Sequence, residues 1–339
     1  MYRALRPLIF RLPPERAHEL TIQLLRLAGA LPPVGALLEA TLRGPDHPVT
    51  LAGLTFRNPV GLAAGYDKDG LAWRGLARLG FGHLELGTVT PRPQAGNARP
   101  RVFRLVPDRA VINRMGFPGR GADFVLARLV GQRPEGLVLG VNIGKNKDTP
   151  LDEAHLDYTE LVRRFAPLAD YLAVNVSSPN TVGLRRLQAR EHLETLLQRV
   201  QAERQQQEQR LGRALPVFVK LAPDLSDVEL QDALGAIQEC GMDGVIAANT
   251  TTARPPLASP HGAETGGLSG APLADLSTAL IRRIHQLTDG SLPIIGVGGI
   301  LDAAAARTKL EAGASLLQLY TGLIYAGPGL VRQVLRGLE

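Results

Sequence analysis

Two different patterns of apolar and polar positions divide the chain near residue 44. Over residues 1–43 the pattern is helical, and a proline pair bounds each end of the first predicted helix. The apolar face of that helix carries Leu20, Leu24, Leu27 and Leu31. A second short helix is predicted over 34–42. We therefore expect a small two-helix extension over 1–43, followed by one large domain over 44–339.

Short apolar runs typical of strands alternate with helical patterns in the large domain. After a predicted hairpin at 49–56, the runs cover 59–63, 83–87, 137–143, 171–176, 217–221, 244–248, 293–296 and 315–320. The clearest helical pattern covers 191–210, with Leu193, Leu196, Leu197 and Val200 on one face. Such alternation indicates parallel βαβ units, and eight of them close most naturally into an α/β TIM (β/α)8 barrel. A doubly wound sheet is the alternative.

The interval between the second and third predicted strands is too long for one βα unit. It contains two further apolar runs, at 101–106 and 109–113. We expect them to form an extra hairpin over the mouth of the barrel.

Composition restricts the possible chemistry. The single cysteine, Cys240, excludes an intramolecular disulfide and favours a reducing compartment. The chain has neither an HExxH motif nor a Cys-x-x-Cys pair, so we expect no metal site. Aromatic residues make up only 4% of the chain and no nucleic-acid-binding motif is present, so we expect no nucleic-acid partner.

The formal net charge of +6 leaves several interpretations open. It could reflect an arginine-rich composition, anionic ligands or an anionic membrane surface. Within 1–43, six arginines accompany three glutamates. A basic, amphipathic helix pair of this kind can lie in a membrane interface, or it can simply pack on the domain that follows. No apolar run approaches the roughly 20 residues that a membrane-spanning helix needs.

Polar or glycine-rich sequences follow the predicted strands. They are AGYDKDG at 64–70, GTVT at 87–90, NIGKN at 142–146, NVSSPN at 175–180, Lys220, NTT at 249–251, GVGG at 296–299 and YTG at 320–322. One such sequence alone would fit an ordinary turn. Eight such sequences, one at the end of each predicted strand, indicate a binding surface, because the active site of a TIM barrel lies at the carboxyl ends of its strands. Amides, lysines and hydroxyls with few carboxylates suit an anionic, planar, amide-rich ligand.

The turns after the last two strands predict a phosphate site. Glycine-rich turns expose backbone N–H groups, and this position of a TIM barrel commonly holds a phosphate. The residues alone therefore predict a barrel enzyme with an anionic substrate and a phosphorylated ligand or cofactor, whose identity they leave open.

From about residue 58 to the C-terminus the chain resembles the dihydroorotate dehydrogenases. The resemblance rests on AGYDKDG at 64–70, NRMGF at 113–117, NIGKNK at 142–147, NVSSPNT at 175–181, KLAPD at 220–224, TGGLSG at 265–270 and IGVGGI at 295–300. Members of this family oxidise dihydroorotate to orotate in pyrimidine synthesis, using FMN. A base removes the C5 proton while a hydride passes from C6 to the flavin.

The resemblance also implies roles for individual residues. Substrate contacts would come from Lys68, Asn113, Arg114, Met115, Gly116, Phe117, Asn175, Asn180, Asn249 and Thr250. Contacts to FMN would come from Ala64, Gly65, Thr88, Asn142, Asn175, Lys220, Gly270, Gly299, Tyr320 and Thr321. Lys220 would lie beside the pyrimidine edge of the flavin, where its charge stabilises the reduced form. Ala248 stands where some relatives have a hydroxyl residue, so a side-chain contact to the flavin is not expected there.

The residue at the base position implies the class. Cytosolic members have cysteine there and membrane-associated members have serine, and this chain has Ser178. Serine is a poor base unless its proton can leave, for which a relay through a threonine or water near Phe117 is a hypothesis. Residues 1–43 would then form the membrane and quinone-access extension, with His18 and Arg104 near the quinone head. We expect a monomeric peripheral membrane protein on the cytoplasmic face.

Two other functions are compatible with a barrel of this kind. A flavin barrel that is reoxidised by NAD or fumarate would have cysteine at position 178 and no helical extension. A catalytically silent barrel that binds a phosphorylated metabolite would have lost its polar strand ends. Neither expectation matches this sequence.

Overall fold

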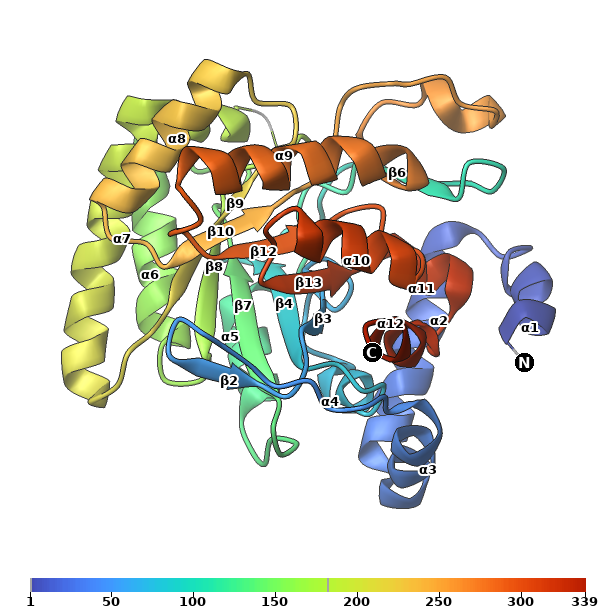
Figure 1. The fold of residues 1–339 in the computed structure, drawn as a ribbon. Coiled ribbons are helices and arrows are strands. Elements are labelled where there is room, and N and C mark those ends of the chain that lie inside the picture. Colours follow the sequence, from blue (N-terminus) through green and yellow to red (C-terminus); the bar gives the residue numbers. More distant parts are fainter. Residues whose placement is uncertain (1, 182) are drawn as a thin grey trace.

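A closed barrel of eight parallel strands forms the centre of the computed structural model, which describes residues 2–181 and 183–339 (Figure 1). The strands are β3 (Val60–Leu62), β4 (His83–Val89), β7 (Val138–Ile143), β8 (Tyr171–Asn175), β9 (Val217–Leu221), β10 (Gly244–Ala247), β12 (Ile294–Val297) and β13 (Leu316–Leu319). Each pairs with the next in chain order, and β13 closes the barrel on β3. The TIM barrel prediction is confirmed, and the doubly wound alternative is excluded.

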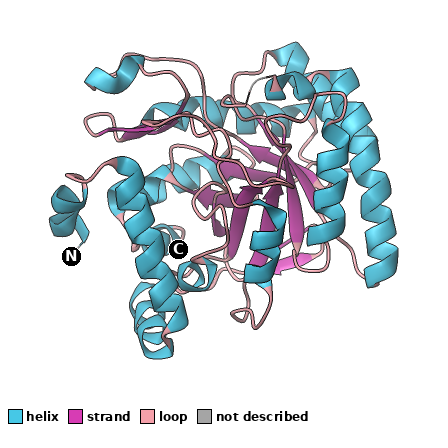
Figure 2. Cartoon of the chain, turned by 180° about the vertical axis from the view of Figure 1, so that it is seen from behind, coloured by secondary structure: helices cyan, strands magenta, loops and turns pink. Residues whose placement is uncertain are grey.

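Helices surround the strands (Figure 2). They are α4 (Trp73–Ala77), α5 (Gly121–Leu129), α6 (Ala154–Phe165), α7 (Arg190–Leu211), α8 (Asp227–Glu239), α9 (Ala274–Leu287), α10 (Ala303–Glu311), α11 (Thr321–Ala326) and α12 (Leu330–Gly337). Helix α7 buries the predicted face of Leu193, Leu196, Leu197 and Val200.

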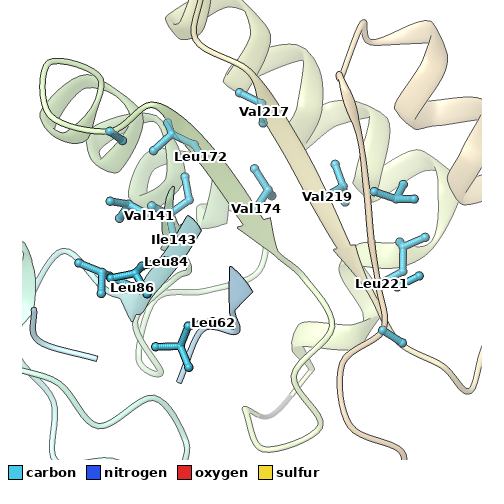
Figure 3. Packing of buried hydrophobic residues seen from close by; sticks show 14 of the residues in the cluster. Leu62, Leu84, Leu86, Val141, Ile143, Leu172, Val174, Val217, Val219 and Leu221 are labelled. Atoms are coloured by element: carbon cyan, nitrogen blue, oxygen red, sulfur yellow. The ribbon is translucent and has the colours of Figure 1, made fainter. Parts of the chain in front are cut away.

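The strands alternate between two apolar layers, as the two-residue period of a strand requires. In β8, Leu172 and Val174 belong to the layer between strands and helices, part of which is drawn in Figure 3. Tyr171 and Ala173 of the same strand belong to the cluster inside the barrel. Because both faces are buried, the strands read as nearly continuous apolar runs.

Aromatic rings fill the closed end of the barrel. The predicted hairpin forms as β1 (Val49–Leu51) and β2 (Leu54–Phe56). Phe56 lies 5.3 Å from the His83 ring, and Phe218 lies 5.4 Å from Tyr171. A glycine faces the His83 ring because a Cβ at Gly61 would lie 2.1 Å from its Nε2 atom.

A small antiparallel sheet lies apart from the barrel strands. The predicted hairpin forms as β5 (Val102–Leu105) and β6 (Ala110–Asn113), and β11 (Gly267–Gly270) adds a third strand in the order β11-β6-β5. Apolar periodicity did not predict β11, because its sequence is Gly-Leu-Ser-Gly and lacks the β-branched and aromatic residues typical of strands.

The N-terminal extension contains both predicted helices, α2 (Pro14–Ala30) and α3 (Pro32–Leu42). A third helix, α1 (Tyr2–Ile9), precedes them and was not predicted, because Pro7 interrupts its pattern. Helix α3 begins at Pro32 rather than at residue 34, since the first turn of a helix tolerates proline. Helix α2 packs closely on α4, where a Cβ at Gly75 would lie 1.9 Å from the Leu25 carbonyl oxygen.

Large apolar side chains remain exposed on this extension. They are Leu5, Leu8, Leu12, Leu20, Leu24, Leu27, Leu31, Val34 and Leu37. Among the described residues, no helix alone is long and apolar enough to cross a bilayer, and only the pair α2 and α3, bent by 108°, passes that test.

Candidate active site

A cavity of about 610 Å³ lies at the carboxyl ends of the barrel strands and reaches the N-terminal helices and the small sheet. Most of the predicted site residues line it, namely Ala64, Gly65, Lys68, Thr88, Asn113, Met115, Gly116, Phe117, Asn175, Ser178, Asn180, Lys220, Asn249, Thr250, Gly270, Gly299, Tyr320 and Thr321. The two predicted quinone contacts, His18 and Arg104, line it as well. One cavity thus joins all three predicted groups of residues.

Two predicted residues do not line this cavity. Asn142 lies beneath its wall, accepting a hydrogen bond from Thr88 Oγ1 at 2.5 Å and another from Asn175 Nδ2 at 3.2 Å. The Arg114 guanidinium pairs with Glu264 Oε2 at 2.6 Å and lies over the Phe103 ring. Asn142 therefore orients residues of the cavity wall, whereas the Arg114 side chain belongs to the outer face of the small sheet.

Four asparagine side chains face the cavity: Asn113 at the end of β6, Asn175 at the end of β8, and Asn180 and Asn249 in the loops after β8 and β10. Asn180 Nδ2 donates to Asn113 Oδ1 at 3.2 Å, which joins the loop after β8 to the small sheet. Asn249 Nδ2 donates to Ser177 Oγ at 3.0 Å and lies 3.4 Å from Asn175 Oδ1. These contacts fix the amides with both donors and acceptors near the cavity, which suits a ring that carries amide groups.

Ser178 lies in the loop that follows β8 and is 5% exposed. Its Oγ atom accepts a long hydrogen bond of 3.3 Å from the Asn180 backbone N–H. Within 2–181 and 183–339 the hydroxyl makes no hydrogen bond to a carboxylate or an imidazole. The loop itself is held by Arg185, which donates to the Ser177 and Thr250 carbonyl oxygens and pairs with an aspartate. Ser178 is therefore positioned at the cavity wall without a dedicated base beside it.

Two lysines bring positive charge to the cavity. Burial lowers the pKa of Lys68 to about 8, and the nearby Asp69 and Asp67 carboxylates oppose this shift. Its Nζ atom donates to the Gly65 carbonyl oxygen at 2.7 Å. Lys220 projects from β9, with its Nζ atom 3.5 Å from a Glu85 oxygen. An ammonium group has three donors, so each lysine retains donors for a ligand.

Glu85 was not predicted as a site residue. It is fully buried inside the barrel and accepts hydrogen bonds from Asn142 at 2.9 Å, Gln318 at 2.8 Å and Tyr171 at 3.2 Å. Through Lys220 and Asn142 it supports the floor of the cavity. A charged residue inside an otherwise apolar strand was the available signal, because carboxylates are rarely buried without partners.

Glycines expose bare backbone on the wall near the last strands. Gly270, Gly298 and Gly299 have φ angles of 97°, 112° and 72°, which favour glycine. A Cβ at Gly270 would lie 2.3 Å from the Arg109 carbonyl oxygen, and one at Gly299 would lie 2.4 Å from the Ala274 Cα. Glycine at these positions therefore permits close backbone packing behind the cavity wall, against Arg109 and the first residue of α9.

The opposite part of the cavity is formed by the N-terminal helices. Burial, together with the nearby Lys68 charge, lowers the pKa of His18 to about 3, so its imidazole is neutral at physiological pH. Arg104 donates to the carbonyl oxygens of Phe10 at 3.0 Å and Leu12 at 2.6 Å. Arg104 therefore ties the small sheet to the segment between α1 and α2, a role that its sequence position did not indicate.

Helix α1 and the residue that follows it contribute to the cavity, which the sequence did not predict. Tyr2 and Phe10 line the cavity, and the Tyr2 hydroxyl donates to the Ile324 carbonyl oxygen at 2.6 Å. The Phe10 ring packs edge-on against Tyr325 at 5.6 Å. These contacts attach α1 and Phe10 to α11, the helix that follows β13.

Comparison with known proteins identifies the family. The family model for dihydroorotate dehydrogenase matches residues 48–339. The chain is 48% identical over 339 residues to a dihydroorotate dehydrogenase (quinone) of Cellvibrio japonicus, covering 100% of this chain and 98% of the relative. It is 51% identical over 347 residues to that of Acidithiobacillus ferrooxidans, covering 99% and 94%.

A solved structure agrees with these relatives. The crystal structure of DHODH in complex with ferulenol from Eimeria tenella has a TM-score of 0.87 and 41% identity, covering 96% of this chain and 90% of that chain. The likeness includes the N-terminal extension as well as the barrel, since the bacterial relatives align over nearly their full length. The chain therefore belongs to the dihydroorotate dehydrogenase family, and within it to the quinone-dependent class.

Proposed function

We propose that this chain oxidises dihydroorotate to orotate in pyrimidine biosynthesis, with FMN as cofactor and a membrane quinone as electron acceptor. The observation that carries the proposal is the single cavity that joins a polar ring at the strand ends to the N-terminal helices. Substrate, cofactor and acceptor need adjoining positions, and this cavity has one region of suitable chemistry for each.

The residues on the cavity wall fit FMN. Gly270, Gly299 and the neighbouring Tyr320 and Thr321 would hold the phosphate, because they line the cavity in turns whose backbone N–H groups could face an anion. Ala64, Gly65 and Thr88 would line the ring and ribityl chain, with Asn142 behind them. Lys220 would face the pyrimidine edge with its remaining donors. The chemistry that bound FMN supplies is acceptance of a hydride equivalent and transfer of electrons to a quinone.

The amide cluster would bind dihydroorotate. Lys68 would pair with the substrate carboxylate, and its pKa of about 8 keeps it mostly charged at pH 7. Asn113, Asn175, Asn180 and Asn249 would hydrogen-bond the ring amides. Met115, Gly116, Phe117 and Thr250 line the same part of the cavity and would restrict the position of the ring. Fixed donors and acceptors would hold C5 near the base.

Ser178 would act as the base that removes the C5 proton. The proton would pass to its Oγ atom while the hydroxyl proton of the serine leaves through a neighbouring group. The Asn180 N–H donates to the Ser178 Oγ atom at 3.3 Å. The hydroxyl proton of Ser178 is not needed for this hydrogen bond and can be donated to another group. A threonine or a water near Phe117 would receive that proton, since the cavity contains no carboxylate or imidazole bonded to Ser178 among the described residues.

The N-terminal extension would admit the quinone and touch the membrane. Its exposed leucines, on α2 and around it, would enter the interface, and its arginines would face anionic head groups. Neutral His18 and Arg104 would contact the quinone head. We propose a division into this extension over 1–43 and a catalytic domain over 44–339, in a monomer at the cytoplasmic face of the cell membrane.

Assays with three electron acceptors test the proposal. The purified protein should be yellow, release FMN on denaturation, and oxidise dihydroorotate with a soluble quinone. Activity only with NAD or fumarate would overturn the quinone assignment. A colourless protein that cannot be reconstituted with FMN, and has no activity with any acceptor, would favour a silent barrel.

A further inference from the structure

Lys309 is a buried cation that the proposed mechanism does not use. It lies on α10 and is only 1% exposed. Its Nζ atom donates to Ser277 Oγ at 2.6 Å and Thr278 Oγ1 at 3.1 Å, and lies 3.4 Å from the Ala274 carbonyl oxygen. All three partners belong to the first two turns of α9, and all are neutral. Within the described ranges 2–181 and 183–339, Lys309 forms no ion pair.

A short chain of contacts leads from this ammonium to the cavity wall. Ser277 Oγ accepts from Lys309 and donates to the Val297 carbonyl oxygen at 2.6 Å. Val297 ends β12, and the next two residues are the cavity-lining Gly298 and Gly299. A Cβ at Gly298 would lie 3.2 Å from the Ser277 Cβ. The ammonium therefore lies directly behind the glycine turn that is proposed to face the phosphate.

The position is electrostatically unfavourable unless an anion is nearby. Burial lowers the pKa of Lys309 to about 8, and the Asp275 carboxylate acts in the opposite direction. At pH 7 the amine is therefore mostly protonated. It also lies beside the first residue of α9, where the positive end of the helix dipole disfavours another cation. A phosphate dianion on the other side of the glycine turn would compensate for both.

We propose that Lys309 is a positioning residue for the flavin phosphate. Through Ser277 it fixes the turn at Gly298 and Gly299, and its charge favours a phosphorylated flavin over riboflavin. The inference rests on the proposed function, because it requires FMN to occupy this cavity. It concerns discrimination between two flavins that share the same ring, so the ring contacts cancel in the comparison.

A flavin exchange experiment tests the inference. The holoenzyme is incubated with a large excess of a riboflavin and FMN mixture, and the bound flavins are quantified by chromatography after denaturation. Lys309→Met should lower the ratio of bound FMN to bound riboflavin by at least about tenfold, because one charge within roughly 10 Å of a dianion contributes at least that much at an effective dielectric constant near 20. Lys309→Arg should retain most of the preference, because the charge remains.

A second neutral variant separates charge from hydrogen bonding. Lys309→Gln keeps a donor for Ser277 but removes the charge, so it should lose the preference for FMN to a similar extent as Lys309→Met. It also keeps the test decisive if Lys309→Met fails to fold. An unchanged ratio in Lys309→Gln would overturn the inference.

Lys145 provides a matched control. It is another buried lysine, 2% exposed, whose Nζ atom donates to two backbone carbonyl oxygens at 3.0 and 2.7 Å. Lys145→Met should lower the melting temperature but leave the flavin ratio within about twofold, because this amine does not lie behind the glycine turn. An equal fall in this control would also overturn the inference. Failure of the wild-type protein to bind FMN or to prefer it would instead contradict the proposed function.

Discussion

The two ends of the barrel are built from the same strands but have opposite chemistry. At the closed end, Tyr171 of β8 and Phe218 of β9 pack ring against ring, 5.4 Å apart. At the open end the same two strands present Asn175 and Lys220 to the cavity. A strand only five residues long thus contributes both to packing and to binding. The difference teaches that position along the strand, rather than the choice of strand, separates stability from function in this fold.

Glu85 lies between the two ends and contacts both. It accepts from the Tyr171 hydroxyl on the closed side and from Asn142 on the open side, and it pairs with Lys220. Burial and this carboxylate raise the pKa of Tyr171 well above its usual value, so the phenol stays protonated and remains a donor. Glu85 and its hydrogen-bond partners therefore separate the aromatic packing at the closed end from the cavity, while leaving few buried polar atoms without partners.

The largest effect is expected at the open end, from Ser178→Ala. Removing the proposed base should slow reduction of the bound flavin by dihydroorotate by about 10³-fold, in the range typical of general-base catalysis. Flavin content and melting temperature should stay close to those of the wild type, because Ser178 makes only one long hydrogen bond among the described residues. Stopped-flow absorbance of the flavin measures the reduction directly. Ser178→Cys is the control and should retain part of the rate; near-normal reduction in Ser178→Ala would contradict the role of Ser178 as base.

The next effect is expected at the closed end, from Phe218→Ala. This ring is fully buried, and its truncation should lower the free energy of unfolding by about 3–5 kcal/mol. The rate of flavin reduction in the protein that remains folded should change by less than about twofold, since Phe218 does not line the cavity. Urea denaturation and stopped-flow reduction on the same preparation separate the two quantities. A slowed reduction with unchanged stability would break the comparison between the two ends.

A smaller effect is expected from His83, and it depends on pH. Burial lowers the pKa of His83 in the folded protein to about 3, whereas the unfolded chain has the ordinary value of 6.5. The unfolded state therefore binds the extra proton, so stability is complete above pH 6.5 and decreases as the pH falls toward 3. The decrease is about 1.4 kcal/mol per pH unit, or about 2 kcal/mol at pH 5.

His83→Leu should remove this part of the pH dependence. Within the described part of the chain neither ring nitrogen of His83 has a hydrogen-bond partner, so the substitution deletes two unsatisfied polar atoms and should cost less than about 1.5 kcal/mol at pH 7.5. Chemical denaturation at pH 7.5 and pH 5 gives the change in the free energy of unfolding with pH for the variant and the wild type. An identical change in the free energy of unfolding for the variant and the wild type would show that His83 is not the source of the acid sensitivity.

The sequence predicted the open end far better than the closed end. Polar residues at 175–180 stand out because they follow an apolar strand, and strand direction then brings such ends together. His83 and Tyr171 carry no comparable signal, because an inward ring inside a short apolar run looks like any other buried residue. Residue roles such as that of Ser178 came from the family resemblance, and they remain predictions.

Two other features could not be predicted for identifiable physical reasons. Helix α1 contains Pro7, which normally ends a helical pattern, and its place in the structure depends on contacts with residues more than 300 positions away. Arg114 belongs to a family motif, but the position of its side chain is set by the ion pair with Glu264, which lies 150 residues later in the sequence. Long-range partners of this kind leave no local trace in the apolar pattern.

The smallest effect is expected from Arg114→Ala, which tests whether every residue of a motif at the open end is functional. Its ion pair with Glu264 is partly exposed, so its loss should cost no more than about 1 kcal/mol of stability. The KM for dihydroorotate should rise by less than about threefold. The adjacent Asn113 does line the cavity, and Asn113→Ala should raise this KM about 10-fold to 100-fold through the loss of a buried hydrogen bond. Steady-state kinetics on both variants compares them directly. An equal rise in KM would mean that the Arg114 guanidinium leaves Glu264 when substrate binds, and that the boundary of the open end extends to the outer face of the small sheet.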